Sequence, residues 1–168
     1  HAPEVECLAK GKVAKKYEFG VKVGVAVTNK SNFVVGMQSL PGNPYDGHTL
    51  QASLEQVERL TGTKPQRCYA DRGYRGHGVT DVEVILAHHR PPTPAQCREL
   101  KRRNAIEPVI GHMKSDGRLG RNFLKGADGD AMNAVLCGAG HNLRIILRKL
   151  RSFWLWIWSI LYSPVVST

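Results

Sequence analysis

Between residues 17 and 29, apolar side chains return at every second position, and this alternation constrains the fold more than any other part of the chain. Its apolar members are Tyr17, Phe19, Val21, Val23, Val25 and Val27. Six apolar residues at a period of two predict a β-strand with one buried face. Turn residues follow at 28–32, and the apolar run 33–37 predicts a second strand. The two strands are therefore expected to pair as an antiparallel hairpin.

Helical and strand patterns alternate after the hairpin. Two further strands are predicted, at 67–70 and 82–87. Helices are predicted over 48–60, from 93 or 94 to about 103, over 106–113 and from about 130 to at least 150. This order predicts an α/β fold: a mixed sheet with flanking helices, as in ribonuclease-H-like nucleases. Many α/β domains share such an order, so function has to be argued from particular residues.

The formal net charge of the chain is +10. Such an excess favours a polyanionic partner, with nucleic acid ahead of a membrane surface. Half of the excess lies in 98–125, where eight basic residues stand against three acidic ones. Lysine and arginine contacts to phosphate position DNA without reading its sequence. The four cysteines are widely spaced and form no Cys-x-x-Cys pair, which indicates reduced thiols rather than a disulfide framework or a zinc ribbon.

Asp71 directly follows the predicted strand 67–70 and precedes a glycine-rich loop at 72–78. Ligands bind preferentially at the carboxyl ends of strands in α/β sheets. Carboxylate oxygens are also the ligands that Mg²⁺ and Mn²⁺ prefer. The local pattern leaves two interpretations open, because an aspartate after a strand can also cap the loop that follows it.

Glu107 lies in a helical pattern with Arg103 four residues before it and Lys114 seven residues after it. On a continuous helix these three side chains would share one face. An apolar stripe is expected on the opposite face: Ile106, Val109, Ile110 and Met113. A solvated face with an ion pair is the alternative interpretation. Pro108 disfavours helix at Glu107, so the helix is expected to start or kink there.

Two of these segments resemble DDE insertion-sequence transposases. Residues 70–76, Ala-Asp-Arg-Gly-Tyr-Arg-Gly, resemble the second-aspartate motif of that family. Arg103, Glu107 and Lys114 keep the spacing of its signature around the last catalytic acid, although Leu100 stands where the family has Tyr. Residues 19–23 and 41–50 also resemble the hairpin and following helix of the insertion-sequence-five group. The resemblance covers roughly 1–150 and leaves 151–168 as an apolar C-terminal tail.

The resemblance implies a ribonuclease-H-like catalytic core that cleaves phosphodiester bonds at transposon ends and transfers the freed strand to target DNA. It implies that Asp71 and Glu107 are catalytic and bind two Mg²⁺ ions, with Mn²⁺ as an alternative. The residues expected to contact DNA or support the site are Arg72, Arg75, Arg103, Lys114, Arg118 and Arg121. The implied partners are double-stranded DNA and further copies of the chain, without a membrane. The implied location is the bacterial cytoplasm, at the nucleoid.

The family's first catalytic aspartate precedes the hairpin. Only Glu4 and Glu6 precede the hairpin here, and neither matches that motif, while Asp46 is assigned to the junction of loop and helix. We therefore expect the first catalytic aspartate and the first strand to lie upstream of His1, and residues 1–168 alone to be inactive or nearly so. The alternative function is that of a non-catalytic, basic DNA-binding remnant of a transposase.

The tail segment 153–162 carries all three tryptophans of the chain. Ten residues are too few to span a bilayer as a helix. One interpretation is a helix that binds a membrane surface or a partner. The interpretation favoured here is a terminal helix that packs on the core, or aberrant sequence near the end of a degraded gene.

Overall fold

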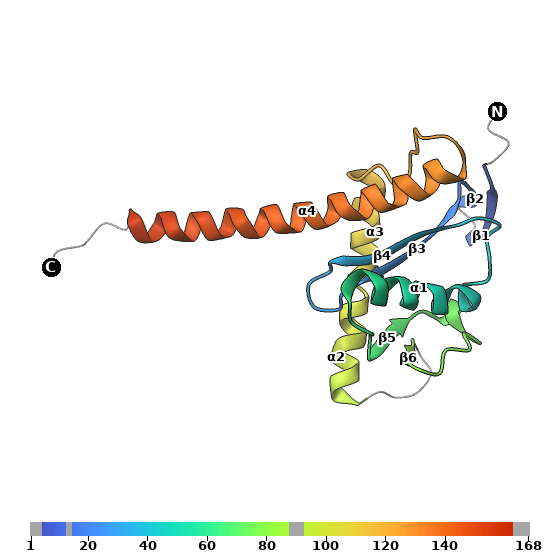
Figure 1. Ribbon diagram of the computed structural model, residues 1–168. Helices are drawn as coiled ribbons and strands as arrows, with labels where there is room; N and C mark the ends of the chain where they lie inside the picture. Colours follow the sequence, from blue (N-terminus) through green and yellow to red (C-terminus); the bar gives the residue numbers. More distant parts are fainter. Residues whose placement is uncertain (1–4, 13–14, 88–92, 163–168) are drawn as a thin grey trace.

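The computed structural model describes residues 5–12, 15–87 and 93–162. Figure 1 shows these residues as a body of short strands and helices from which the second half of the last helix extends. The mixed α/β composition expected from the sequence is confirmed. Glu4, one of the two acidic residues before the hairpin, lies outside the described part of the chain, as do residues 88–92.

The predicted hairpin is confirmed as strands β3 (Lys22–Val27) and β4 (Val34–Leu40), which pair antiparallel. The alternating segment 17–29 is nevertheless not one strand. It is interrupted at Gly20, whose φ of +126° lies in a region that favours glycine. The residues before this break form β2 (Lys15–Phe19), which pairs antiparallel with β1 (Cys7–Lys12), a strand that the alternation did not predict.

A third pair of strands carries Asp71 at its end. Strand β5 (Arg67–Ala70) pairs with β6 (Glu83–Leu86), and this pair is parallel. The strands of the described residues therefore form three two-stranded sheets instead of the expected single mixed sheet. Helix α1 (Asp46–Thr61) contacts β3 and β4 and also the short 3₁₀ helix η1 (Arg72–Tyr74) that follows β5. Figure 1 shows α1 between the hairpin and the β5–β6 pair.

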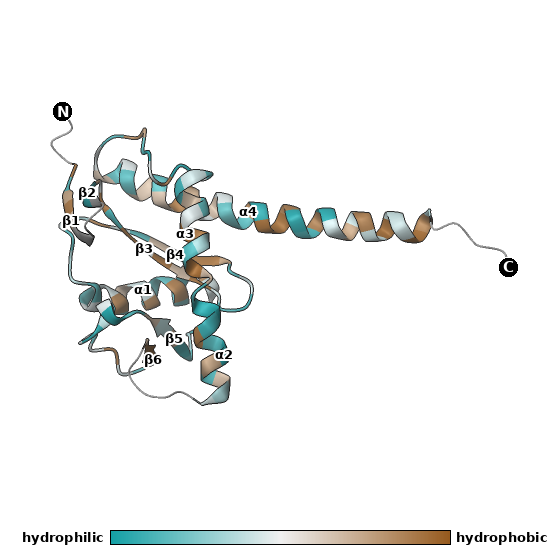
Figure 2. Cartoon of the chain, turned by 180° about the vertical axis from the view of Figure 1, so that it is seen from behind, coloured by the Kyte–Doolittle hydropathy of each residue, from teal (hydrophilic) through white to brown (hydrophobic). Residues whose placement is uncertain are grey.

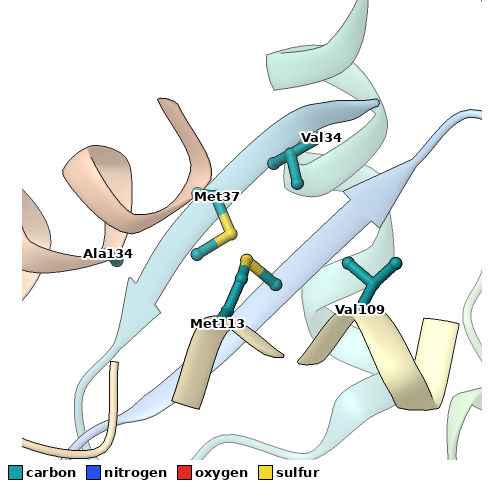
Figure 3. Close-up of a cluster of buried hydrophobic side chains, with 5 residues drawn as sticks. All are labelled: Val34, Met37, Val109, Met113 and Ala134. Carbon is teal, nitrogen blue, oxygen red and sulfur yellow. The ribbon is translucent and has the colours of Figure 1, made fainter. Parts of the chain in front are cut away.

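Two separate apolar clusters hold the body together. The first, drawn in Figure 3, joins β4 to two later helices through Val34, Met37, Val109, Met113 and Ala134. Met113 is fully buried in it. The second joins α1 to the β5–β6 region through Leu50, Leu54, Val79 and Val82. Helix α1 therefore connects the hairpin to the strand that ends at Asp71.

Arg103 and Glu107 do not lie on one continuous helix. Helix α2 (Pro94–Arg103) ends before Asn104, and α3 (Ile106–Ser115) begins two residues later. The break falls at Asn104, four residues before Pro108. In a continuous helix the ring of Pro108 would clash with the Asn104 carbonyl, and proline has no N–H to donate a hydrogen bond to that carbonyl. The start of α2 is as expected, because Thr93 and Gln96 form a capping box at its N-terminus.

The last helix, α4 (Gly126–Leu161), consists of a packed half and a projecting half. The packed half lies against β4, where the Asn142 amide exchanges two hydrogen bonds of 2.8 Å with the backbone of Val34. Gly138 permits this approach, since a Cβ there would lie 2.8 Å from Met37 Cγ.

The apolar tail does not pack on the core as expected. Residues 153–161 continue α4 without a break, and all of these side chains except the half-buried Ile157 are exposed. Figure 2 shows this apolar stretch at the far end of the projecting helix. None of the helices in 5–12, 15–87 and 93–162 combines the length and apolarity that crossing a membrane requires.

Candidate active site

Asp71 lies immediately after β5 and is exposed. Its carboxylate Oδ1 accepts a hydrogen bond of 2.8 Å from the backbone N–H of Gly73 and thereby caps η1. The capping interpretation left open by the sequence is therefore observed. This bond also fixes the orientation of the carboxylate at the end of the strand, which is where the predicted metal ligand should lie.

The structure brings a second carboxylate, that of Asp46, next to Asp71. A Cβ built on Gly73 would lie 2.6 Å from Asp46 Oδ2 and 3.0 Å from Asp71 Oδ1. Both carboxylates therefore border the same small space, which any side chain larger than glycine would fill. Local sequence patterns placed Asp46 only at the junction of loop and helix and gave no sign of this approach.

A close contact between α1 and the loop after β5 produces this arrangement. A Cβ on Gly47 would lie 2.6 Å from the carbonyl oxygen of Arg75, so the first turn of α1 touches the loop backbone. The Tyr45 hydroxyl donates a hydrogen bond of 2.9 Å to the same carbonyl. Lys22 Nζ lies 2.5 Å from Asp46 Oδ1 and 2.7 Å from the Pro44 carbonyl oxygen. The ammonium group of Lys22 offsets part of the negative charge gathered at this junction.

The pKa of Tyr74 depends in part on the negative charges of Asp46 and Asp71 at this junction. Its half-buried ring packs against the second apolar cluster. Burial, followed by the negative charges of Asp46 and Asp71, raises the pKa of Tyr74 to about 12. The phenol is therefore neutral at physiological pH and adds no charge to that of the two carboxylates.

Glu107 lies in the first turn of α3 and is exposed. Within the described part of the chain its carboxylate forms no hydrogen bond or ion pair. Arg103 lies at the end of α2, and its Nε atom is buried without a hydrogen-bond partner among those residues. The described part of the chain holds no group of three or more His, Cys, Asp or Glu side chains placed to bind a metal. A metal site shared by Asp71 and Glu107 stays a prediction.

A polar cluster connects the two regions that carry the predicted carboxylates. Arg67 of β5 donates to Glu83 at 2.6 Å and to Glu99 of α2 at 3.1 Å. Tyr69 of β5 also donates its hydroxyl hydrogen to Glu99. The hydrogen bond from Tyr69, then that from Arg67, lowers the pKa of Glu99. The strand that ends at Asp71 is thus tied to the helix that leads to Glu107, a connection that sequence analysis missed.

Three of the basic residues expected to contact DNA lie together. Lys114, Arg118 and Arg121 line a hollow of about 400 Å³ that also has Ser115, Gly120 and Phe123 in its walls. Phe123 was missed by sequence analysis, although its place two residues after Arg121 in a basic segment was visible. Arg72 and Arg75 are exposed on the loop next to Asp71. The predicted DNA contacts are therefore distributed over the Asp71 loop, the end of α2 and this hollow.

Comparison with known proteins gives one match. Residues 6–82, a little under half of the chain, match the family model described as "Transposase DDE domain". The matched stretch includes Asp46, Asp71 and Gly73 and ends before Glu107. No curated protein and no solved structure matches the chain. The family match, read together with Asp71 at the end of β5, supports a DDE transposase.

Proposed function

We propose that this chain is the catalytic-core portion of an insertion-sequence transposase of the insertion-sequence-five group. The reaction is metal-dependent cleavage of a phosphodiester bond at a transposon end, followed by strand transfer into target DNA. The observation that carries the proposal is the match of residues 6–82 to the transposase DDE domain, with Asp71 fixed at the carboxyl end of β5 inside that match.

The proposed cofactor is a pair of Mg²⁺ ions, or Mn²⁺, held by Asp71 and Glu107. The donor set fits hard divalent cations, which prefer carboxylate oxygens. The carboxylate oxygens of Asp46 and Asp71 both approach Gly73, so the negative charge that attracts such cations gathers at the Asp71 end of the proposed site. When bound, such ions activate the attacking oxygen and stabilise the leaving oxygen.

The chain's own residues bind and orient the DNA in this proposal. Lys114, Arg118 and Arg121 hold phosphates of the backbone, while Arg72 and Arg75 contact DNA next to Asp71. Arg103 supports Glu107 from the end of α2. The hydrogen bond from Gly73 keeps the Asp71 carboxylate in one orientation before substrate arrives, so its ordering costs little during binding.

The proposed architecture is ribonuclease-H-like. A hairpin, a helix and a strand that ends in an aspartate follow one another in the order expected for it. The proposed partners are double-stranded DNA and further copies of the chain, and the proposed location is the bacterial cytoplasm at the nucleoid.

The test uses the longest natural protein that contains these residues. Asp71→Asn and Glu107→Gln are each expected to abolish Mg²⁺-dependent cleavage of transposon-end DNA, while DNA binding and the circular dichroism spectrum stay as in the parent. Asp81→Asn is the matched control, because Asp81 is an exposed aspartate like Asp71 but pairs with Lys64 and lies outside the candidate site. Unchanged cleavage in either site variant would overturn the assignment.

A non-catalytic DNA-binding role is the second candidate. The basic hollow favours it, because phosphate binding by Lys114, Arg118 and Arg121 needs no metal. This role predicts DNA binding that depends steeply on salt but not on Mg²⁺ or Mn²⁺. It also predicts that the natural protein does not cleave DNA in the presence of either ion.

A further inference from the structure

Phe123 is an exposed aromatic residue in the wall of the basic hollow. Its side chain is 74% exposed. The guanidinium carbon of Arg118 lies 5.8 Å from the centroid of its ring, within the range of a cation–π contact. Exposed aromatic rings among basic side chains are typical of surfaces that bind single-stranded nucleic acid, because bases stack on the ring while the cations hold phosphates.

The loop holds Phe123 in place although the ring itself is exposed. The Asn122 side chain accepts a hydrogen bond of 2.9 Å from the N–H of Leu124 and donates one of 2.7 Å to Asp130 of α4. These bonds fix the backbone on both sides of Phe123. The same loop is also anchored by a hydrogen bond of 2.9 Å, which the backbone N–H of Leu119 donates to the Met113 carbonyl oxygen. A ring presented by a fixed backbone loses little conformational entropy when a ligand binds.

The hollow offers cations and an aromatic face together. Lys114, Arg118 and Arg121 line it with Phe123, and its volume of about 400 Å³ leaves room for a ligand group. The bases of a duplex are stacked on their neighbours, so their faces are covered. Only an unpaired nucleotide can place its base on the ring and its phosphate among the cations at the same time.

We propose that this hollow binds an unpaired nucleotide of a DNA strand, with its base stacked on Phe123 and its phosphates held by Lys114, Arg118 and Arg121. The inference rests on the proposed function in taking DNA as the partner. It deepens that function by specifying that this surface accepts unpaired nucleotides. Phosphate contacts and metal ligands alone would not distinguish a single strand from a duplex.

The test compares single-stranded and duplex DNA of one sequence on the full chain, with one 2-aminopurine in the single strand as a stacking probe. Phe123→Ala is expected to weaken single-strand binding about 5- to 100-fold and to remove quenching of the probe. Duplex binding should stay within about twofold, and the salt slope should not change, because no cation is lost. Phe123→Trp should retain both binding and quenching.

Phe19→Ala is the matched control, since Phe19 is 76% exposed but lies on β2, outside the hollow. It should leave single-strand binding unchanged. If the parent binds duplex and single strands but Phe123→Ala leaves affinity and quenching as they were, this inference fails and the proposed function stands. An equal loss of duplex and single-strand binding in Phe123→Ala also overturns it. A parent chain that binds neither form of DNA overturns both proposals.

Discussion

The surroundings of Asp71 and of Glu107 differ in how far the structure fixes each carboxylate. Asp71 is held by the Gly73 N–H and lies beside Asp46, at a junction built from a strand, a 3₁₀ helix and the start of α1. Glu107 projects from the first turn of α3, and its carboxylate has no hydrogen-bond or ion-pair partner among the described residues. The two predicted ligands therefore differ in preorganisation.

This difference has a physical origin in the backbone. Two glycines, Gly47 and Gly73, allow α1 and the loop after β5 to approach more closely than residues with a Cβ would permit. Near Glu107 the described residues make no comparable approach, and nothing lies within 4 Å of a Cβ built on Gly111.

Replacing the glycine at each site should give effects of opposite sign. Gly47→Ala places a Cβ 2.6 Å from the backbone carbonyl oxygen of Arg75, so we expect a loss of about 1–3 kcal/mol of unfolding free energy. Gly111→Ala removes a flexible residue from open space inside α3 and should gain about 0.5–1 kcal/mol. Urea unfolding followed by circular dichroism measures both. Equal effects in the two variants would show that the junction is not tightly packed.

Truncating each carboxylate should also separate the two regions. Asp71→Ala removes the cap of η1 and is expected to cost about 1 kcal/mol. Glu107→Ala should change the unfolding free energy by less than about 0.5 kcal/mol, because the side chain is exposed. Asp71→Asn, which keeps an oxygen to accept the Gly73 N–H, should restore most of the loss. A cost for Glu107→Ala as large as that for Asp71→Ala would contradict the comparison.

The pKa of Tyr74 should change when a carboxylate near Asp71 is neutralised, but not when Glu107 is neutralised. Asp46→Asn removes a negative charge beside the phenol and should lower this pKa from about 12, although burial, the larger cause, keeps it above 10. Glu107→Gln should leave it unchanged. Ultraviolet titration of tyrosinate, with Tyr74→Phe to identify the band, measures the shift. Because folding raises this pKa, the stability that it contributes is complete below pH 10 and is lost as the pH rises to about 12.

Local patterns were sufficient for much of the secondary structure. The hairpin, the strand before Asp71 and a helix start at 93 or 94 were all predicted from short stretches of sequence. Pro108 also indicated a helix boundary, and the structure sets it at Asn104, where the proline ring would clash. These features depend on residues within a few positions of one another, which is the range over which periodicity and capping act.

Tertiary contacts were not visible in this way. The approach of Asp46 to Asp71 joins positions 25 residues apart and depends on how α1 packs, which no alternation encodes. The break at Gly20 was missed because its apolar neighbours continue the period of two across it. Phe123 was overlooked because the hollow that gives its ring a role is lined from α3 and from the loop before α4.

The projecting half of α4 has a consequence for spectroscopy. Trp154, Trp156 and Trp158 are each 60–65% exposed, and neither apolar cluster contains a tryptophan. Intrinsic tryptophan emission from this protein therefore reports on solvent around the far end of one helix. A denaturation curve recorded from that emission would follow local fraying of α4, and the core could unfold with little change in signal.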